Sequence, residues 1–292
     1  MLGWMLKIKK ILAPVDFPDT SLRVLHQAAV VAHSFQSDIV ILHAVRPLND
    51  PGGVKGNETG FAGGDMLAEI ARESERKSDP TLAEELQGLV IRQVVVRGDP
   101  AQAIVQTAQA ESADLIMMPS HGSTFNQFLL GSVTAKVLHG TECPVWTGGH
   151  IEESPGQKFA LKNVLCVIEL GPRSAKAVSW AATMAAKFSA RLTLAHVTAS
   201  VDLWGPGGTY IDLKWKTQLV SDASRRIANL QQNMGIKAEV LIGSGDVPKV
   251  VHAMVKQTNA DLLVSECYPY GGNLRIHGYA IICAVPIPVL SV

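Results

Sequence analysis

The strongest constraint on the fold is that this sequence repeats itself. Residues 11–16 (ILAPVD) open the first half and residues 164–169 (VLCVIE) open the second. In each half a His-x-Val motif follows at the same spacing, at His43 and at His196. A repeat of this length is a duplicated domain rather than a short solenoid unit. Function therefore has to be sought in each half separately.

A second pair of motifs recurs at the same spacing in both halves. Gly98-Asp99 precedes an Ala-Asp-Leu segment at 113–115, and Gly245-Asp246 precedes Ala-Asp-Leu at 260–262 by the same interval. Between the halves, residues 148–156 are rich in Gly and Pro and read as a linker. With 292 residues, 47% of them hydrophobic, the chain can bury two cores. We expect two domains, over residues 1–150 and 158–292.

Charge and hydropathy exclude several classes of protein. Lys plus Arg and Asp plus Glu number 26 each, so nothing supplies the counterion release that drives nucleic-acid binding. Apolar stretches such as 39–45 and 279–292 are too short or too rich in proline to span a bilayer. The lysines at positions 7, 9 and 10 leave no apolar region of the secretory type. We predict a cytoplasmic protein that binds neither nucleic acid nor membrane, with its four cysteines reduced.

Short apolar or β-branched runs alternate with amphipathic stretches in both halves. This alternation predicts an α/β fold, with a parallel sheet covered by helices on both faces. Asp99 and Asp246 are expected helix caps. An irregular connection follows the second strand of each half, and whether these connections are ligand lids or variable surface loops stays open. The expected strands are 8–15, 38–45, 90–97 and 114–118, then 162–168, 191–198, 236–242 and 261–265; the irregular connections are 49–64 and 203–208.

One segment carries candidate chemistry, the small-residue loop after the fourth strand of the first half. Residues 118–134 read MPSHGSTFNQFLLGSVT, and an apolar helical pattern follows. This places Gly131, Ser132, Val133 and Thr134 at a helix N-terminus, where unpaired amides and the helix dipole favour an anion. The Ser132 and Thr134 hydroxyls are expected to add hydrogen bonds. A capped helix without any ligand is the alternative that this pattern leaves open.

Several of these motifs together resemble the universal stress protein family. The resemblance covers the first half almost completely and the second half more weakly. It implies two tandem, doubly wound, parallel-sheet domains of the adenine-nucleotide alpha-hydrolase type, each with five strands in the order 3-2-1-4-5. The segments that carry it are Pro14-Val15-Asp16, Leu42-His43-Ala44-Val45, Gly98-Asp99-Pro100, residues 113–118, Ser120-His121-Gly122, Gly131-Ser132-Val133-Thr134 and Cys143-Pro144-Val145.

The resemblance also implies a ligand, ATP or a related adenine nucleotide, and leaves Mg²⁺ open as its companion. Pro14, Asp16 and Ala44 would line the adenosine pocket. Met118 and Gly122 would flank the ribose and phosphates. The phosphates would rest on Gly131, Ser132, Val133 and Thr134.

The chain departs from the family's Gly-x2-Gly-x9-Gly-Ser/Thr pattern. Pro119 replaces the first glycine, and the loop between Gly122 and Gly131 is one residue shorter. Proline removes an amide donor. Neither change removes the unpaired amides and the dipole at the helix N-terminus, which favour an anion. In the second half Glu266 aligns with Pro119 and Tyr279 aligns with Ser132. We expect nucleotide binding in the first half and a degenerate site in the second.

Other residues give weaker indications of a functional site. His43 and His196 are expected to be hydrogen-bonded structural residues, and the Cys and His spacings fit no zinc motif. Neither a Walker loop nor a nucleophile elbow is present, so efficient catalysis is not expected. The aromatic residues 204, 210 and 215 are expected to cover a core or an interface.

The fifth strands, 143–147 and 286–292, bear on assembly. The resemblance implies that the two halves pair through them about a pseudo-twofold axis, and a further homodimer stays open. Besides a nucleotide-binding stress protein, two functions remain as alternatives: an interaction scaffold without nucleotide, and a slow nucleotide hydrolase.

Overall fold

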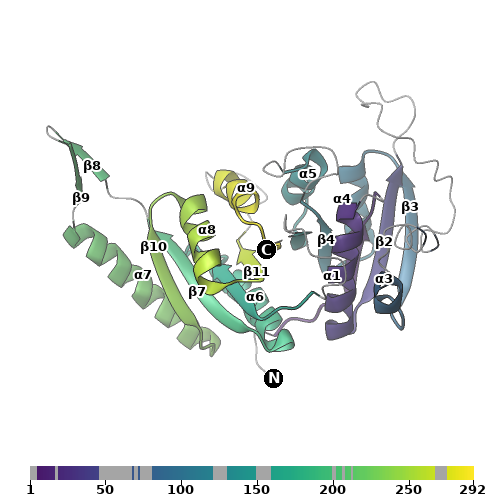
Figure 1. Ribbon diagram of the computed structural model, residues 1–292, viewed down its shortest axis with the longest axis horizontal. Coiled ribbons are helices and arrows are strands. Elements are labelled where there is room, and N and C mark those ends of the chain that lie inside the picture. Colours follow the sequence, from purple (N-terminus) through teal and green to yellow (C-terminus); the bar gives the residue numbers. More distant parts are fainter. Residues whose placement is uncertain are drawn as a thin grey trace. The chain divides into compact units, whose positions relative to one another are not determined.

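Figure 1 shows the computed structural model, which describes most of the chain. The chain separates into two compact units, Lys7–Gly148 and Ala160–Val292. Leu6 belongs with the second unit, where its amide donates a hydrogen bond to the Thr183 hydroxyl (3.1 Å). The described residues are 5–16, 19–45, 68, 72, 81–120, 130–148, 159–198, 202–205, 208–211, 213–266 and 275–292.

The first unit is a parallel sheet in the order β3-β2-β1-β4-β5, which confirms the predicted strand order. The strands are β1 (Lys10–Pro14), β2 (Asp38–Val45), β3 (Ile91–Arg97), β4 (Leu115–Pro119) and β5 (Val145–Gly148). The helices are α1 (Asp19–Phe35), α3 (Thr81–Glu85), α4 (Pro100–Ala110) and α5 (Ser132–Gly140).

The second unit repeats this arrangement in the order β10-β7-β6-β11-β12, again with all strands parallel. Its strands are β6 (Asn163–Val167), β7 (Arg191–Thr198), β10 (Glu239–Ser244), β11 (Leu262–Ser265) and β12 (Val289–Ser291). Its helices are α6 (Ser174–Phe188), α7 (Leu213–Met234), α8 (Val247–Thr258) and α9 (Arg275–Ala284).

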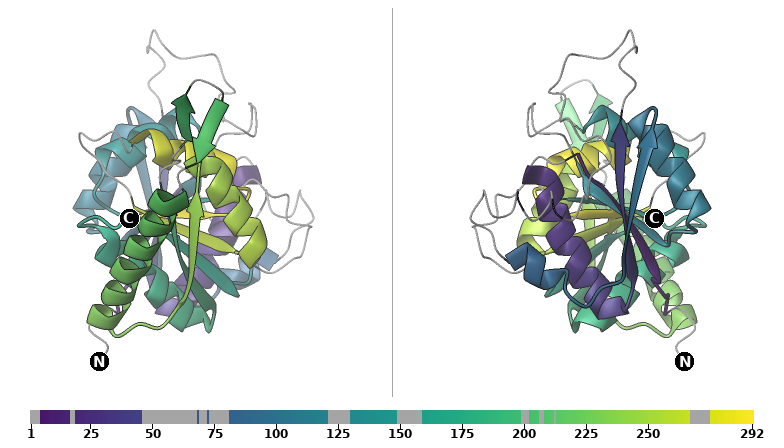
Figure 2. Two further views of the ribbon diagram at one scale, coloured as in Figure 1. Left: turned by 90° about the vertical axis from the view of Figure 1, so that its left-hand side faces the viewer. Right: turned by 90° about the vertical axis from the view of Figure 1, so that its right-hand side faces the viewer.

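The sequence explains why these sheets are parallel. The central strands are continuous apolar runs because helices cover both of their faces. Every residue of β11 is buried, as are the first four of β4. Figure 2 shows α7 and α8 on opposite sides of β10 in the second unit. Asp99 and Asp246 cap α4 and α8 as predicted, because each carboxylate accepts a hydrogen bond from the amide of the third residue of its helix.

The repeated histidines have one structural role. His43 Nδ1 lies 2.9 Å from the Val15 carbonyl oxygen, and His196 Nδ1 lies 2.8 Å from that of Ile168. A carbonyl only accepts, so each ring donates through Nδ1 and ties the second strand of its sheet to the residue that follows the first. This confirms the prediction of hydrogen-bonded structural histidines.

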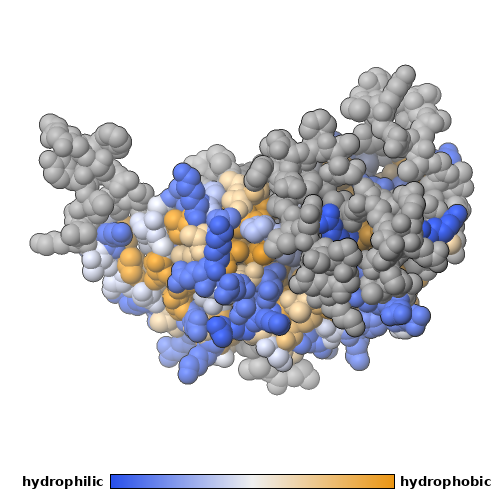
Figure 3. All heavy atoms as spheres, in the orientation of Figure 1, coloured by the Kyte–Doolittle hydropathy of each residue, from blue (hydrophilic) through white to orange (hydrophobic). Residues whose placement is uncertain are grey.

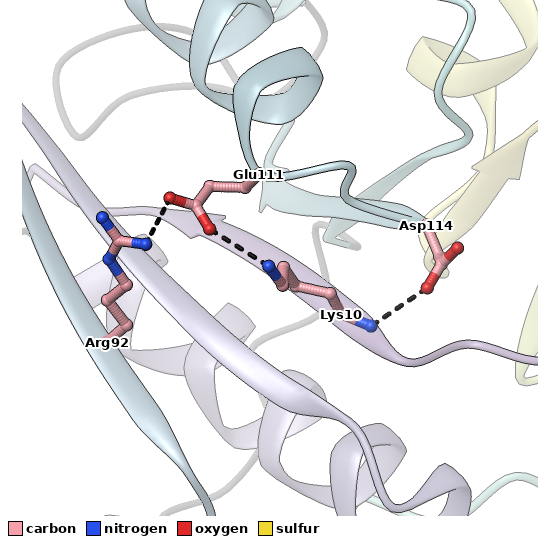
Figure 4. Close-up of polar contacts among 4 residues, drawn as sticks. All are labelled: Lys10, Arg92, Glu111 and Asp114. Atoms are coloured by element: carbon pink, nitrogen blue, oxygen red, sulfur yellow. Dashed lines mark hydrogen bonds and ion pairs between the residues drawn. The ribbon is translucent and has the colours of Figure 1, made fainter.

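A second repeated device lies at the amino ends of the strands. Asp114 Oδ2 accepts hydrogen bonds from the amides of Lys9 (2.7 Å) and Lys10 (3.0 Å). Glu111 lies beside it and holds two cations, the Lys10 ammonium at 3.1 Å and the Arg92 guanidinium at 2.8 Å (Figure 4). In the second unit Asp261 accepts from the corresponding amides of residues 162 (2.7 Å) and 163 (2.8 Å). At the amino edge of each sheet, an equivalent aspartate therefore binds the two amides at the start of the first strand.

One interpretation from sequence is wrong. Residues 203–208 were expected to form an irregular connection, but the chain folds there into an antiparallel hairpin of β8 (Asp202–Gly205) and β9 (Gly208–Ile211). The two strands pair from Asp202 with Ile211 to Gly205 with Gly208. The connection at 49–64 and Gly122 lie outside the described residues.

The described surface is mixed in character. Among the helices of the described ranges, none combines the length and hydropathy that crossing a bilayer requires. Over α7, β10 and α8, apolar side chains emerge between polar ones (Figure 3). Trp215 on α7 is 53% exposed, so this residue does not belong to the core.

Candidate functional site

The candidate site of the first unit lies at the carboxyl edge of its sheet. Pro14 closes β1, Ala44 lies one residue before the end of β2, and Met118 lies one residue before the end of β4. Because neighbouring parallel strands end at the same edge, these three residues face one region of the unit. Asp16, two residues beyond β1, is exposed, whereas Met118 is buried.

The helix start next to this edge has the geometry that an anion requires. Gly131 is the N-cap of α5, with extended backbone angles (φ −61°, ψ 144°), and makes no side-chain capping bond. The first intrahelical bond runs from the Ala135 amide to the Gly131 carbonyl (2.9 Å). Helix geometry therefore leaves the amides of Ser132, Val133 and Thr134 without an intrahelical acceptor. These amides form the positive end of the α5 dipole.

Two hydrogen bonds fix this helix start to β4. The Gly131 amide donates to the Ser120 carbonyl oxygen (2.9 Å), and the Thr134 hydroxyl donates to that of Pro119 (2.9 Å). Thr134 is buried, and a hydroxyl has one proton to donate. The Thr134 hydroxyl thus already has an acceptor in Pro119, and its expected hydrogen bond to an anion stays a prediction. Ser132 is exposed, and its hydrogen bond to an anion stays a prediction.

A cation that the sequence reasoning missed lies on the same helix. The Lys136 ammonium is 3.2 Å from a carboxylate oxygen of Asp99, the cap of α4. The amide of Gln102 and, after it, Lys136 lower the pKa of Asp99 below its usual value. Lys136 follows Ser132 by four residues, so both lie on one side of α5. This four-residue spacing is the sequence feature from which Lys136 could have been predicted to lie beside Ser132. Aligning the two halves on Asp99 and Asp246 gives what we call the landmark alignment. In it, Cys283 of the second unit matches Lys136.

The second unit departs from this geometry in two ways, of which the first is the start of its helix. The landmark alignment pairs Gly278 with Gly131, but α9 already begins at Arg275. Gly278 is therefore inside the helix, and the Tyr279 amide falls where helix geometry supplies an intrahelical acceptor. The amides that align with those of Ser132, Val133 and Thr134 are no longer an open helix terminus.

The second departure is Glu266, which follows β11 directly. Its side chain is buried, with 7% of the residue exposed. Its Oε1 accepts hydrogen bonds from the Glu169 amide (2.9 Å) and the Ser174 hydroxyl (2.6 Å). Burial and, after it, the charge of Glu266 raise the pKa of the Cys166 thiol above its ordinary value. Glu266 thus faces into the unit rather than toward an incoming ligand.

Comparison of the sequence with known protein families identifies the family of this chain. The sequence profile of the universal stress protein family matches residues 7–147 and again residues 160–266. The chain belongs to the universal stress protein family. The first match includes the helix start at Ser132, whereas the second ends at Glu266, before α9.

Three of the similar proteins are named universal stress proteins. The chain is 32% identical over 138 residues to universal stress protein MJ0531 of Methanocaldococcus jannaschii, covering 47% of this chain and 79% of that protein. It is 31% identical over 138 residues to universal stress protein A homolog 2 of Coxiella burnetii, covering 47% and 92%. A crystal structure of a universal stress protein from Archaeoglobus fulgidus matches 99% of this chain and 97% of that one, with a TM-score of 0.65 and 20% identity. This last similarity shows the tandem fold.

Proposed function

We propose that the first unit binds an adenine nucleotide such as ATP at the carboxyl edge of its sheet, without efficient catalysis. The functional domains would be residues 1–150 and 158–292. The observation that carries the proposal is the start of α5. There the amides of Ser132, Val133 and Thr134 form an open helix terminus that two hydrogen bonds hold at the end of β4.

The remaining predicted residues would take the roles that the family resemblance implies. Pro14, Asp16 and Ala44 would contact the adenosine, and Met118 and Gly122 the ribose and phosphates. The Ser132 hydroxyl and the three amides would hold the phosphates. Gly131 would act by allowing close approach, because its own amide is already bonded to Ser120. Mg²⁺ would accompany a bound triphosphate.

The proposal predicts one nucleotide per chain. In the second unit the aligned amides are inside α9, and the family match stops at Glu266. Nucleotide extracted from the purified protein should amount to about one adenine per chain. Titration of nucleotide-free protein with ATP in a calorimeter should give the same stoichiometry. Two nucleotides per chain, or none at millimolar ATP, would contradict the proposal.

A matched pair of variants locates the site. Gly131→Tyr places a bulky side chain at the open helix start and should abolish binding. Gly278→Tyr is the control at the aligned position of the second unit, where an added Cβ meets no atom within 4 Å among the described neighbours. It should leave the stoichiometry unchanged. Equal loss of binding in both variants would show that the effect is not local to α5.

The two alternatives make different predictions. A slow hydrolase releases phosphate from bound ATP, and a phosphate-release assay with the Gly131→Tyr variant as blank measures it. An interaction scaffold binds no nucleotide and works through its surface, which the exposure of Trp215 favours. Pairing of the two halves through their fifth strands, a further homodimer and a cytoplasmic location stay predictions.

A further inference from the structure

The second unit contains a filled anion position at the carboxyl edge of its own sheet. Glu266 brings a carboxyl group to the ends of β6 and β11, and the group is buried although glutamate is rarely buried in proteins. One oxygen, Oε1, accepts two hydrogen bonds, from the Glu169 amide at 2.9 Å and from the Ser174 hydroxyl at 2.6 Å. These donors come from the end of β6 and the start of α6.

A helix start and a buried thiol surround this carboxyl group. Ser174 is the first residue of α6, so the group lies near the positive end of that helix dipole. The neighbouring thiol of Cys166 is fully buried and stays protonated, and so adds no competing charge. The two donors and the helix start therefore contact Glu266 as they would contact a bound carboxylate ligand.

The turn between the two donors needs such an anchor. Leu170 adopts a left-handed conformation (φ 60°), which is unfavourable for a residue with a branched side chain. Its carbonyl oxygen accepts a hydrogen bond from the Arg226 guanidinium, and Glu266 holds the amide of the preceding residue. The strained turn is thus fastened on both sides by charged side chains. In the first unit Pro119 stands where Glu266 stands, so this internal carboxylate is specific to the second unit.

We propose that the carboxyl edge of the second unit is a carboxylate-binding site that the chain fills with its own Glu266. Its ligand class is a small monocarboxylate. Removing the side chain should open the site to such an anion from solution. This inference does not depend on nucleotide binding by the first unit.

The experiment is chemical rescue in the full-length protein. Glu266→Ala removes the carboxylate and leaves both donors and a space, so the variant should unfold at a lower temperature than the wild type. Sodium formate should then raise its Tm above that in sodium chloride of equal ionic strength. For a dissociation constant of about 10 mM, about 100 mM formate should raise Tm by roughly 3 to 6 °C.

Two further variants control the result. Glu266→Gln keeps an acceptor oxygen in place, so formate should not raise its Tm. Asp261→Ala removes a carboxylate that also accepts two hydrogen bonds, but at the amino edge of the same sheet. Asp261 is partly exposed, and water can replace its carboxylate, so formate should have no specific effect there. A formate effect of equal size in Asp261→Ala or in the wild type would overturn the proposal.

A second readout covers severe destabilisation. If Glu266→Ala cannot be purified in the folded state, it is refolded from urea in formate and in chloride. Recovery of folded protein in formate alone supports the proposal. Recovery in neither salt, or a folded variant whose Tm does not respond to formate, shows that Glu266 only fills space.

Discussion

The hydrogen bond between the Thr134 hydroxyl and the Pro119 carbonyl can be tested with one isosteric change. Thr134→Val keeps the shape of a side chain that is 3% exposed and removes the donor to an oxygen 2.9 Å away. The variant loses a neutral hydrogen bond and leaves a poorly solvated carbonyl, which together should cost about 1 to 2 kcal/mol. The start of α5 should open more often as a result.

Hydrogen exchange followed by mass spectrometry reports this locally. If local opening dominates exchange in α5, a cost of about 1 to 2 kcal/mol accelerates it roughly 5- to 30-fold. Thr107→Val is the control, because Thr107 is also buried but lies on the neighbouring helix α4. Unchanged exchange in α5, or equal acceleration there in Thr107→Val, would refute the view that Thr134 fastens this helix start.

Three further changes probe the packing and the charges of both units. Glu111→Gln removes the charge that holds two cations and should cost about 1 kcal/mol in urea unfolding, with a smaller cost at high salt; equal costs at both salt concentrations would contradict this. Trp146→Phe removes a fully buried indole whose Nε1 donates to Gln27 (2.9 Å), and should cost about 2 to 4 kcal/mol by calorimetry. Burial raises the pKa of the Cys166 thiol above its ordinary value of 9.0, so the folded state holds this proton more tightly than the unfolded state. Stability should therefore fall as pH rises above 9.0. The fall, up to about 1.4 kcal/mol per pH unit, should be absent in Cys166→Ala, and identical alkaline slopes would argue against a buried thiol.

The features that sequence predicted are those set by local pattern. Continuous apolar strands between amphipathic helices are enough to predict parallel sheets, and the duplicated landmarks predict that there are two. Asp99 and Asp246 cap their helices because a carboxylate before a first turn needs no tertiary context. The start of α5 at Ser132 follows from Gly131 in the same way.

The features that sequence missed depend on contacts between distant segments. The alignment placed Glu266 in a degenerate site, but no local pattern shows that its carboxyl group turns inward to residues 169 and 174. The bond that occupies the Thr134 hydroxyl also joins two separate elements. The start of α9 at Arg275 moves the aligned glycine into the helix, and residue-by-residue alignment carries no information on where a helix begins.

The two units resemble each other at the amino edge of the sheet and differ at the carboxyl edge. At the amino edge the same aspartate, Asp114 or Asp261, still accepts from the same pair of amides. At the carboxyl edge one copy ends in an open helix terminus and the other in a buried glutamate. Substitution at the two aspartates should therefore weaken both halves alike, while substitution at the opposite edge should have effects peculiar to one half. A duplicated sheet of this kind can change its chemistry at one end while the other end keeps the fold intact.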